Sequence, residues 1–154
     1  MSIEEKVARL LIARKKTLSV AESCSGGLLC HRLTNIPGSS NFLKLGLVVY
    51  SNDAKIKFLK ISVPTLKKYG AVSEPIARQM TENVRKLFQT DFGLAITGIA
   101  GPGGGSIEKP VGLTFIAVST NKKTVCQKIF FKGNRLKIKE QAVTQALKML
   151  YTVF

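Results

Sequence analysis

Hydroxyl and thiol side chains gather in the segment AESCSGG at residues 21–27, where Ser23, Cys24 and Ser25 precede two glycines. The segment follows a short apolar run, LSVA, that is typical of a buried strand. A hydroxyl at the turn between such a strand and a helix lies near free backbone N–H groups, which can stabilise an oxyanion. On local sequence alone, Ser23 or Ser25 is either a nucleophile or the cap of the following helix.

A serine nucleophile needs a base, and a lysine whose pKa is lowered by burial can provide one. The one histidine, His31, falls one to two turns along the expected helix, where we expect a structural or surface role. Lys55 falls in YSNDAK, on the first turn of a helix after a second apolar run. Because Tyr50 ends that run, Tyr50 and Lys55 are expected beside Ser23. Most lysines of so basic a chain lie on the surface, and only its place after a strand singles out Lys55.

A second glycine-rich segment, TGIAGPGGGS at residues 97–106, follows the apolar run GLAI. Glycine lets the backbone approach a ligand and lets consecutive N–H groups point at an anion. The spacing is not that of a Walker loop, and a strand rather than a helix follows, which excludes a dinucleotide fingerprint. The segment is either a substrate-binding loop or a hairpin-like loop without a ligand. Arg135, near the start of the last helix, is either a planar clamp for a phosphate or carboxylate or a solvated arginine.

The chain has 154 residues and a formal net charge of +15, from 24 Lys and Arg against 9 Asp and Glu. The basic residues are spread along the chain, none of their clusters alternates with aromatic residues, and no zinc knuckle is present. We therefore do not expect a nucleic-acid partner, although a phosphate-bearing metabolite would benefit from the same field.

Three cysteines without a pairing pattern indicate a reducing compartment. No apolar run is long enough to span a bilayer, and the amino-terminal segment, with its early acids, does not resemble a signal peptide. We expect a cytoplasmic protein without a membrane partner. One histidine and few acids predict no metal site.

These residues must be positioned by alternating helices and apolar strands. Helices are expected at about residues 3–16, 28–35, 51–60, 63–69, 74–88 and 136–153, and strands at 18–21, 45–50, 92–97, 111–120 and 123–131. The run at 45–50 is apolar throughout, which favours an interior strand covered on both faces. The last two strands form an antiparallel hairpin. The pattern predicts one domain over residues 1–154, a three-layer α/β/α domain with a mixed, mostly parallel sheet.

In this order, the motifs AESCSGG, VVYSNDAK, GAVSEP, TGIAGPGGGSIEKPVG and GNR resemble the CinA C-terminal domain family over about residues 3–150. The long glycine motif with its KPVG tail is specific, whereas each short motif alone is weak. Characterised members are nicotinamide-nucleotide amidohydrolases (NMN deamidases). Ser25 stands where threonine is more usual, and Asn134 where aspartate often occurs. Larger members carry an amino-terminal nucleotide-pyrophosphatase domain, whose activity and metal are not expected of this chain.

The resemblance implies hydrolysis of the carboxamide of nicotinamide mononucleotide to nicotinate mononucleotide and ammonia, in pyridine-nucleotide recycling. It implies that Ser23 is the nucleophile and Lys55 its base, with Tyr50 nearby. No cofactor is expected, and a homodimer is the default expectation. The expected substrate contacts come from both glycine segments and the last helix: Ser25, Gly26, Gly27, Thr97, Gly98, Gly101, Gly103, Gly104 and Arg135.

Three other functions remain open at this point. The chain could be an inactive relative that acts as an interaction module in DNA uptake or recombination, as the family's competence-linked name suggests. It could be a basic nucleic-acid binder, or an amidohydrolase of another pyridine or amide metabolite. The intact pair of Ser23 and Lys55 favours an enzyme over the first two.

Overall fold

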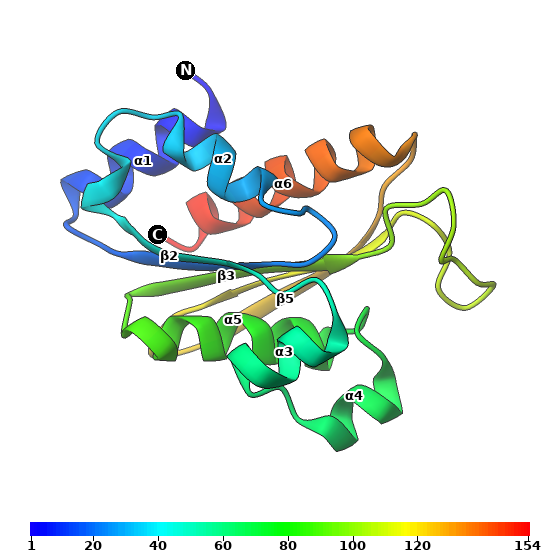
Figure 1. Ribbon diagram of the computed structural model, residues 1–154. Coiled ribbons are helices and arrows are strands. Elements are labelled where there is room, and N and C mark those ends of the chain that lie inside the picture. Colours follow the sequence, from blue (N-terminus) through cyan, green and yellow to red (C-terminus); the bar gives the residue numbers. More distant parts are fainter.

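Five strands form one sheet between two layers of helices in the computed structural model, which describes residues 1–154 (Figure 1). The strand order is β2-β1-β3-β4-β5, in which β1, β2 and β3 are parallel and β4 and β5 continue the sheet as an antiparallel hairpin. This arrangement confirms the predicted α/β/α domain with a mixed sheet. The strands are β1 (Leu18–Glu22), β2 (Leu43–Val48), β3 (Phe92–Gly98), β4 (Leu113–Ser119) and β5 (Thr124–Phe130).

Six α-helices lie on the two sides of the sheet, with α1, α2 and α6 on one side and α3, α4 and α5 on the other, where α3 and α4 pack against α5 (Figure 1). They are α1 (Ile3–Ala13), α2 (Leu28–Thr34), α3 (Asn52–Leu59), α4 (Val63–Tyr69), α5 (Glu74–Phe88) and α6 (Arg135–Thr152), with a 3₁₀ turn at Ser39–Asn41. None of these helices combines the length and the apolar character needed to cross a membrane.

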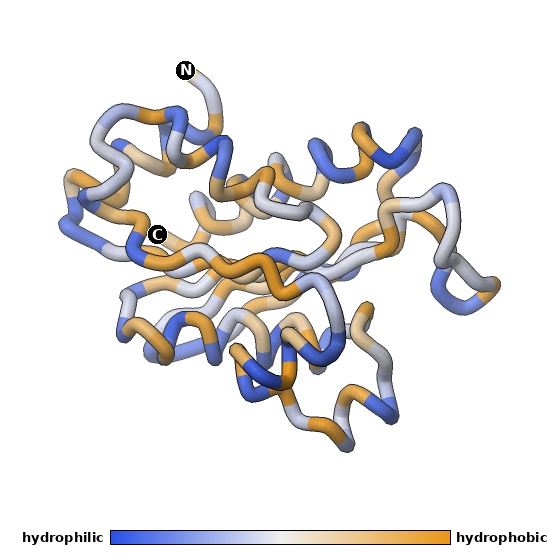
Figure 2. Tube along the Cα trace, viewed as in Figure 1, coloured by the Kyte–Doolittle hydropathy of each residue, from blue (hydrophilic) through white to orange (hydrophobic).

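Each face of the sheet has its own apolar core, because successive residues of a strand point to opposite faces. In β1, Leu18 and Val20 pack with the α1, α2 and α6 layer, whereas Ala21 packs with the α3, α4 and α5 layer. Figure 2 shows hydrophobic segments concentrated in the sheet between the two layers. Because β1, β2 and β3 run parallel, their carboxyl ends meet on one side of the domain, where loops can form a ligand site.

β2 lies at the edge of the sheet, so the prediction of an interior strand at residues 45–50 is wrong. Its residues alternate between half-buried and exposed, and Val48 is 49% exposed. The apolar run misled because its exposed positions in β2, Gly46 and Val48, carry no polar side chain. Tyr50 lies two residues beyond the end of β2.

Local capping explains most helix boundaries. Ser2 caps α1, with Glu5 completing a capping box, and α1 ends at Ala13 rather than near residue 16. α4 ends at Tyr69, and the C-cap residue Gly70 has a φ of +76°, which suits glycine. The pattern at residues 73–74 suggests a cap by Ser73, but Ser73 does not cap α5, because its hydroxyl donates to the Gly70 carbonyl.

Candidate active site

Ser23 and Lys55 form a buried pair at the carboxyl end of β1. The Lys55 Nζ atom donates to the Ser23 Oγ atom at 2.9 Å. Ser23 is 8% exposed and Lys55 is 1% exposed, which is rare for a lysine. The Ser23 N–H also donates to the Ile96 carbonyl at 3.0 Å, so that the serine is held to β3 just after β1 ends. The two residues therefore occupy fixed positions relative to the sheet.

The local structure around α3 explains why Lys55 points inward. Ser51 caps α3 through its side chain, which accepts from the Ala54 N–H at 3.0 Å. Lys55 is the fourth residue of the helix and faces the sheet, where its ammonium group also donates to the Val49 carbonyl at 2.9 Å and the Tyr50 carbonyl at 3.2 Å. No carboxylate pairs with it. Burial without a counter-charge lowers the pKa of Lys55 from 10.5 to about 8.

The turn from Ser23 to Gly27 exposes backbone donors next to this pair. The Gly26 N–H donates to the Ser23 carbonyl and the Leu28 N–H to the Ser25 carbonyl, both at 3.1 Å. The N–H groups of Cys24, Ser25 and Gly27 have no acceptor within the protein. Positive φ angles of +60° at Gly26 and +100° at Gly27 shape the turn, and both positions are strained for other residues. Three free N–H groups beside a serine can stabilise an oxyanion.

A crevice of about 290 Å³ opens above the Ser23–Lys55 pair. Nine of the twelve site residues expected from the sequence line it: Ser23, Tyr50, Lys55, Thr97, Gly98, Gly101, Gly103, Gly104 and Arg135. The other three, Ser25, Gly26 and Gly27, do not line it; Gly26 lies beside Lys139 of α6 and Gly27 beside Val48 of β2. The two glycine-rich segments begin 76 residues apart, at Ala21 and Thr97, and both contribute residues to this one crevice.

Arg135 connects three segments at the mouth of the crevice. As the first residue of α6, it donates to the Gly101 carbonyl at 2.6 Å and to the Tyr50 hydroxyl at 3.1 Å. Tyr50 is 61% exposed, so its ring lies at the rim of the crevice. The Tyr50 hydroxyl makes no hydrogen bond with Lys55, which donates to the Tyr50 carbonyl instead. The arginine is thus a bridge across the rim and not a freely solvated side chain.

Thr97 and Cys24 are two further buried side chains in the crevice. The Thr97 hydroxyl donates to the Ala71 carbonyl at 2.9 Å and so holds the loop between α4 and α5 against β3. Burial raises the pKa of the Cys24 thiol to about 11, which keeps it protonated at neutral pH. Of the candidate nucleophiles, Ser23 alone has a base within hydrogen-bond distance.

Several lining residues were not identified from the sequence. Asn52 lines the crevice from the first residue of α3, and its place three residues before Lys55 could have indicated it. Ala71 and Val72 also line it, but apolar loop residues carry no sequence signal. Lys139, one turn after Arg135 on α6, lies beside the Ser23–Gly27 turn: a Cβ atom at Gly26 would be 3.5 Å from its Nζ atom. It adds positive charge next to the free N–H groups.

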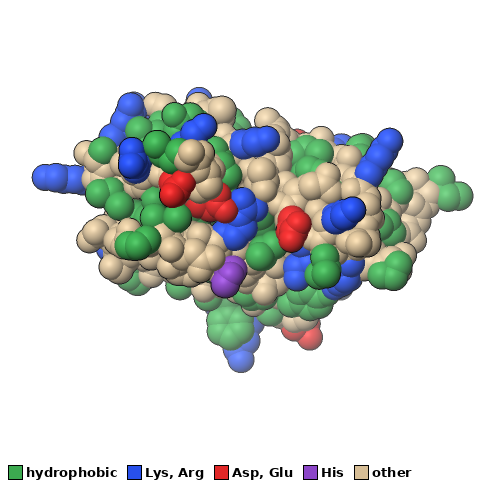
Figure 3. Space-filling view, turned by 90° about the horizontal axis from the view of Figure 1, so that it is seen from above, with side chains coloured by type: hydrophobic (Ala, Val, Ile, Leu, Met, Phe, Trp, Pro, Cys, Tyr) green, Lys and Arg blue, Asp and Glu red, His purple; other side chains and the backbone are tan.

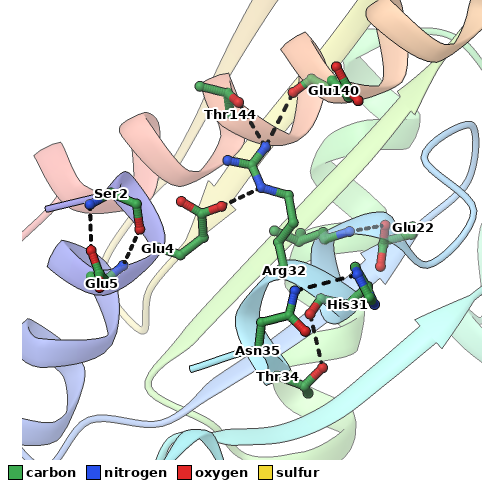
Figure 4. Close-up of polar contacts among 11 residues, drawn as sticks. Ser2, Glu4, Glu5, Glu22, His31, Arg32, Thr34, Asn35, Glu140 and Thr144 are labelled. Atoms are coloured by element: carbon green, nitrogen blue, oxygen red, sulfur yellow. Dashed lines mark hydrogen bonds and ion pairs between the residues drawn. The ribbon is translucent and has the colours of Figure 1, made fainter. Parts of the chain in front are cut away.

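Basic side chains are scattered over the face formed by α1, α2 and α6, with few acidic ones among them (Figure 3). One network on this face is tightly organised. Arg32 of α2 bonds to Glu4 of α1 at 2.5 Å and to the Thr144 hydroxyl of α6 at 2.8 Å, and so joins three helices (Figure 4). His31 lies exposed on α2, away from Lys55. No three His, Cys, Asp or Glu side chains gather as a metal site would require.

The fold and the crevice define a class of protein, an α/β domain with a buried serine–lysine pair at the carboxyl ends of its parallel strands. The chain belongs to the CinA family, since the model of the CinA C-terminal domain matches residues 1–154. This finding confirms the resemblance seen in the motifs.

Relatives and solved structures agree with this assignment. A CinA-like protein of Syntrophus aciditrophicus is 51% identical over 97% of this chain, and a protein of Thermoanaerobacter pseudethanolicus, whose name refers to competence-damage induction, is 48% identical over 96%. Each match covers 36% of the relative, so the chain spans about a third of the length of these proteins.

Two crystal structures cover nearly the whole domain. The competence/damage inducible protein of Agrobacterium tumefaciens has a TM-score of 0.93 at 39% identity over 98% of this chain and 94% of its own. A CinA superfamily protein of Klebsiella pneumoniae has a TM-score of 0.94 at 34% identity over 97% and 94%.

Proposed function

We propose that this domain hydrolyses the carboxamide of nicotinamide mononucleotide to nicotinate mononucleotide and ammonia. The observation that supports this proposal most strongly is the buried pair of Ser23 and Lys55, with 2.9 Å between Oγ and Nζ. Ser23, Lys55 and Cys24, whose N–H group is free, line one crevice, and a nucleophile, a base and an N–H donor are the groups that acyl transfer requires. The amide substrate comes from the family resemblance, and the names of the matched relatives do not refer to it.

The hydrogen bonds of Lys55 suit the role of a base. A neutral amine has two N–H groups and one lone pair, and the carbonyls of Val49 and Tyr50 accept the two N–H groups. The lone pair then faces Ser23, whose hydroxyl donates to it. Because the pKa of Lys55 is lowered to about 8, an appreciable fraction of the lysine is neutral near neutral pH. The same two carbonyls keep the ammonium in place after it takes the proton.

The proposed reaction has two stages, acylation of Ser23 and hydrolysis of the resulting ester. The Ser23 oxygen attacks the carboxamide carbon while its proton passes to Lys55, and the oxyanion forms next to the turn that carries the free N–H groups, of which Cys24 lines the crevice. The C–N bond breaks as Lys55 returns the proton to the departing nitrogen, which leaves as ammonia. A water molecule next attacks the ester and gives its proton to Lys55. Breakdown of the second oxyanion releases the acid, while Lys55 returns the proton to the Ser23 oxygen, which regenerates the serine hydroxyl and the neutral base.

Binding energy from the remote phosphate would orient the amide over Ser23. The backbone of Gly98 to Gly104 and the guanidinium of Arg135 lie at the same crevice and supply N–H donors and positive charge. Free nicotinamide lacks this phosphate and should therefore react far more slowly.

Ammonia release from the purified domain tests the proposal. We expect release from nicotinamide mononucleotide and much less from nicotinamide at the same concentration. Release from another amide of a panel would instead assign a different substrate to the same site. No release from any amide, together with binding of DNA or RNA that weakens steeply with salt, would favour the nucleic-acid function that the charge of +15 raises.

A further inference from the structure

Glu22, the last residue of β1, is a buried acid without a cationic partner. Its side chain is fully buried, and none of the three salt bridges includes it. Because residues of a strand alternate between faces, Glu22 points to the same side as Leu18 and Val20, toward α2 and α6. An acid here is costly unless backbone or side-chain donors satisfy it. Its position next to Ser23 therefore needs an explanation.

The carboxylate of Glu22 is satisfied by the first turn of α2. One oxygen accepts from the Leu29 N–H at 2.9 Å and the other from the Cys30 N–H at 3.1 Å. These N–H groups have no acceptor within the helix. The residue that precedes α2 is Gly27, which has no side chain to cap them. Glu22 therefore caps α2 from outside the helix, and Figure 4 shows its carboxylate beside α2.

The main chain of Glu22 is tied to the segment that carries the acceptors of Lys55. The Glu22 carbonyl accepts from the Val49 N–H at 2.9 Å, and the Val49 carbonyl accepts from the Lys55 ammonium group. Glu22 is thus bonded both to the helix that follows the Ser23 turn and to the segment that holds Lys55. Its side chain fixes the far end of the turn from Ser23 to Gly27, and its main chain fixes the segment that holds the base.

We propose that Glu22 is a positioning residue that sets the geometry of the Ser23 turn, and with it the direction of the free Cys24, Ser25 and Gly27 N–H groups. The inference rests on the proposed function for its catalytic consequence. The turn is anchored at Ser23 by β1 and β3, and at Leu29 and Cys30 by the carboxylate. Without the second anchor, α2 can shift along the sheet and carry the N–H groups out of line.

Glu22→Gln tests this role with nearly the same side-chain volume. The amide NH₂ meets one of the two backbone N–H groups, so that one contact becomes donor against donor. We expect kcat to fall by about 10²-fold with KM changed by less than threefold, since a small misplacement of reacting groups costs about this much. Glu22→Asp keeps the charge on a shorter side chain and should lose about tenfold.

Reaction with a fluorophosphonate gives a readout that does not depend on the natural substrate. The Ser23 oxygen bonds to phosphorus, fluoride leaves, and the rate reports the reactivity of the serine. Labelling should slow in parallel with kcat in both Glu22 variants. Its pH midpoint should stay near that of the wild type, because Lys55 is untouched.

Glu4→Gln is the matched control. Glu4 is a partly buried acid that also holds α2, through Arg32. If Glu22 acts by positioning the turn, Glu4→Gln lowers stability but leaves labelling unchanged. Labelling and kcat at wild-type values in folded Glu22→Gln would overturn the inference. Glu22→Asp takes the place of this variant if Glu22→Gln does not fold. Labelling that slows equally in Glu4→Gln would also overturn the inference. Labelling of the wild type without ammonia release would reject the proposed substrate and leave this comparison intact.

Discussion

The Nζ atom of Lys55 and the Oγ atom of Ser23 lie 2.9 Å apart although 32 residues separate them in the chain. The parallel pairing of β1 with β2 brings them together, because it places the ends of both strands on one side of the sheet. The lysine is 1% exposed and has only neutral oxygen atoms as partners. This relationship leads to the following predictions.

Replacing Lys55 by arginine should be about as damaging as replacing it by methionine. Arginine keeps the positive charge but cannot act as a base at workable pH. We expect both variants to lower kcat by about 10³-fold or more, within the range for loss of a general base. Steady-state assays of ammonia release measure the effect. An active Lys55→Arg variant would show that the site needs only positive charge.

Activity should rise with pH, with a midpoint near the lowered pKa of Lys55, about 8. The neutral lysine is the reactive form, and its fraction grows as pH passes through this value. The pH dependence of kcat/KM reports the groups of the free enzyme. A midpoint near the ordinary lysine value of 10.5, or no rise between pH 6 and 9, would contradict the assignment.

The same pKa shift predicts a stability effect of defined sign. Between about pH 8 and 10.5 the unfolded chain binds a proton at Lys55 that the folded protein does not, so stability rises with pH across this window. Below pH 8 the full cost of the buried charge remains. Lys55→Met should therefore unfold at a higher temperature than the wild type at pH 7, with a gain on the order of 2 kcal/mol. Thermal unfolding should show this gain shrinking toward pH 10; a constant gain or a loss would contradict it.

Ser25→Ala should preserve activity and fold. The Ser25 hydroxyl is fully buried and has no hydrogen-bond partner, so its removal relieves an unsatisfied polar group. We expect the free energy of unfolding to change by less than about 1 kcal/mol, or to rise. The main-chain N–H of Ser25 is retained. An inactive Ser25→Ala protein with normal activity in Ser23→Ala would reverse the assignment of the nucleophile.

Most of the fold follows from the sequence because the signals are local. Ser2 and Ser51 are side-chain caps, and the strands β3 and β4 are short apolar runs. The place of β2 at the edge could not be predicted, since the apolar run does not reveal which strand lies beside it. Likewise, the pair of Ser23 and Lys55 could be proposed from strand ends, whereas the contacts of Glu22 depend on how α2 docks on the sheet.

The central claim is that Ser23 is the nucleophile of an amide hydrolase, and ammonia release by the wild type and by Ser23→Ala tests it most directly. Thermal unfolding and circular dichroism first establish that both proteins are folded. With nicotinamide mononucleotide in excess, the wild type should release ammonia catalytically, and Ser23→Ala should be slower by about 10⁴-fold or more. Absence of release from the folded wild type, or a comparable rate in Ser23→Ala, would contradict the claim.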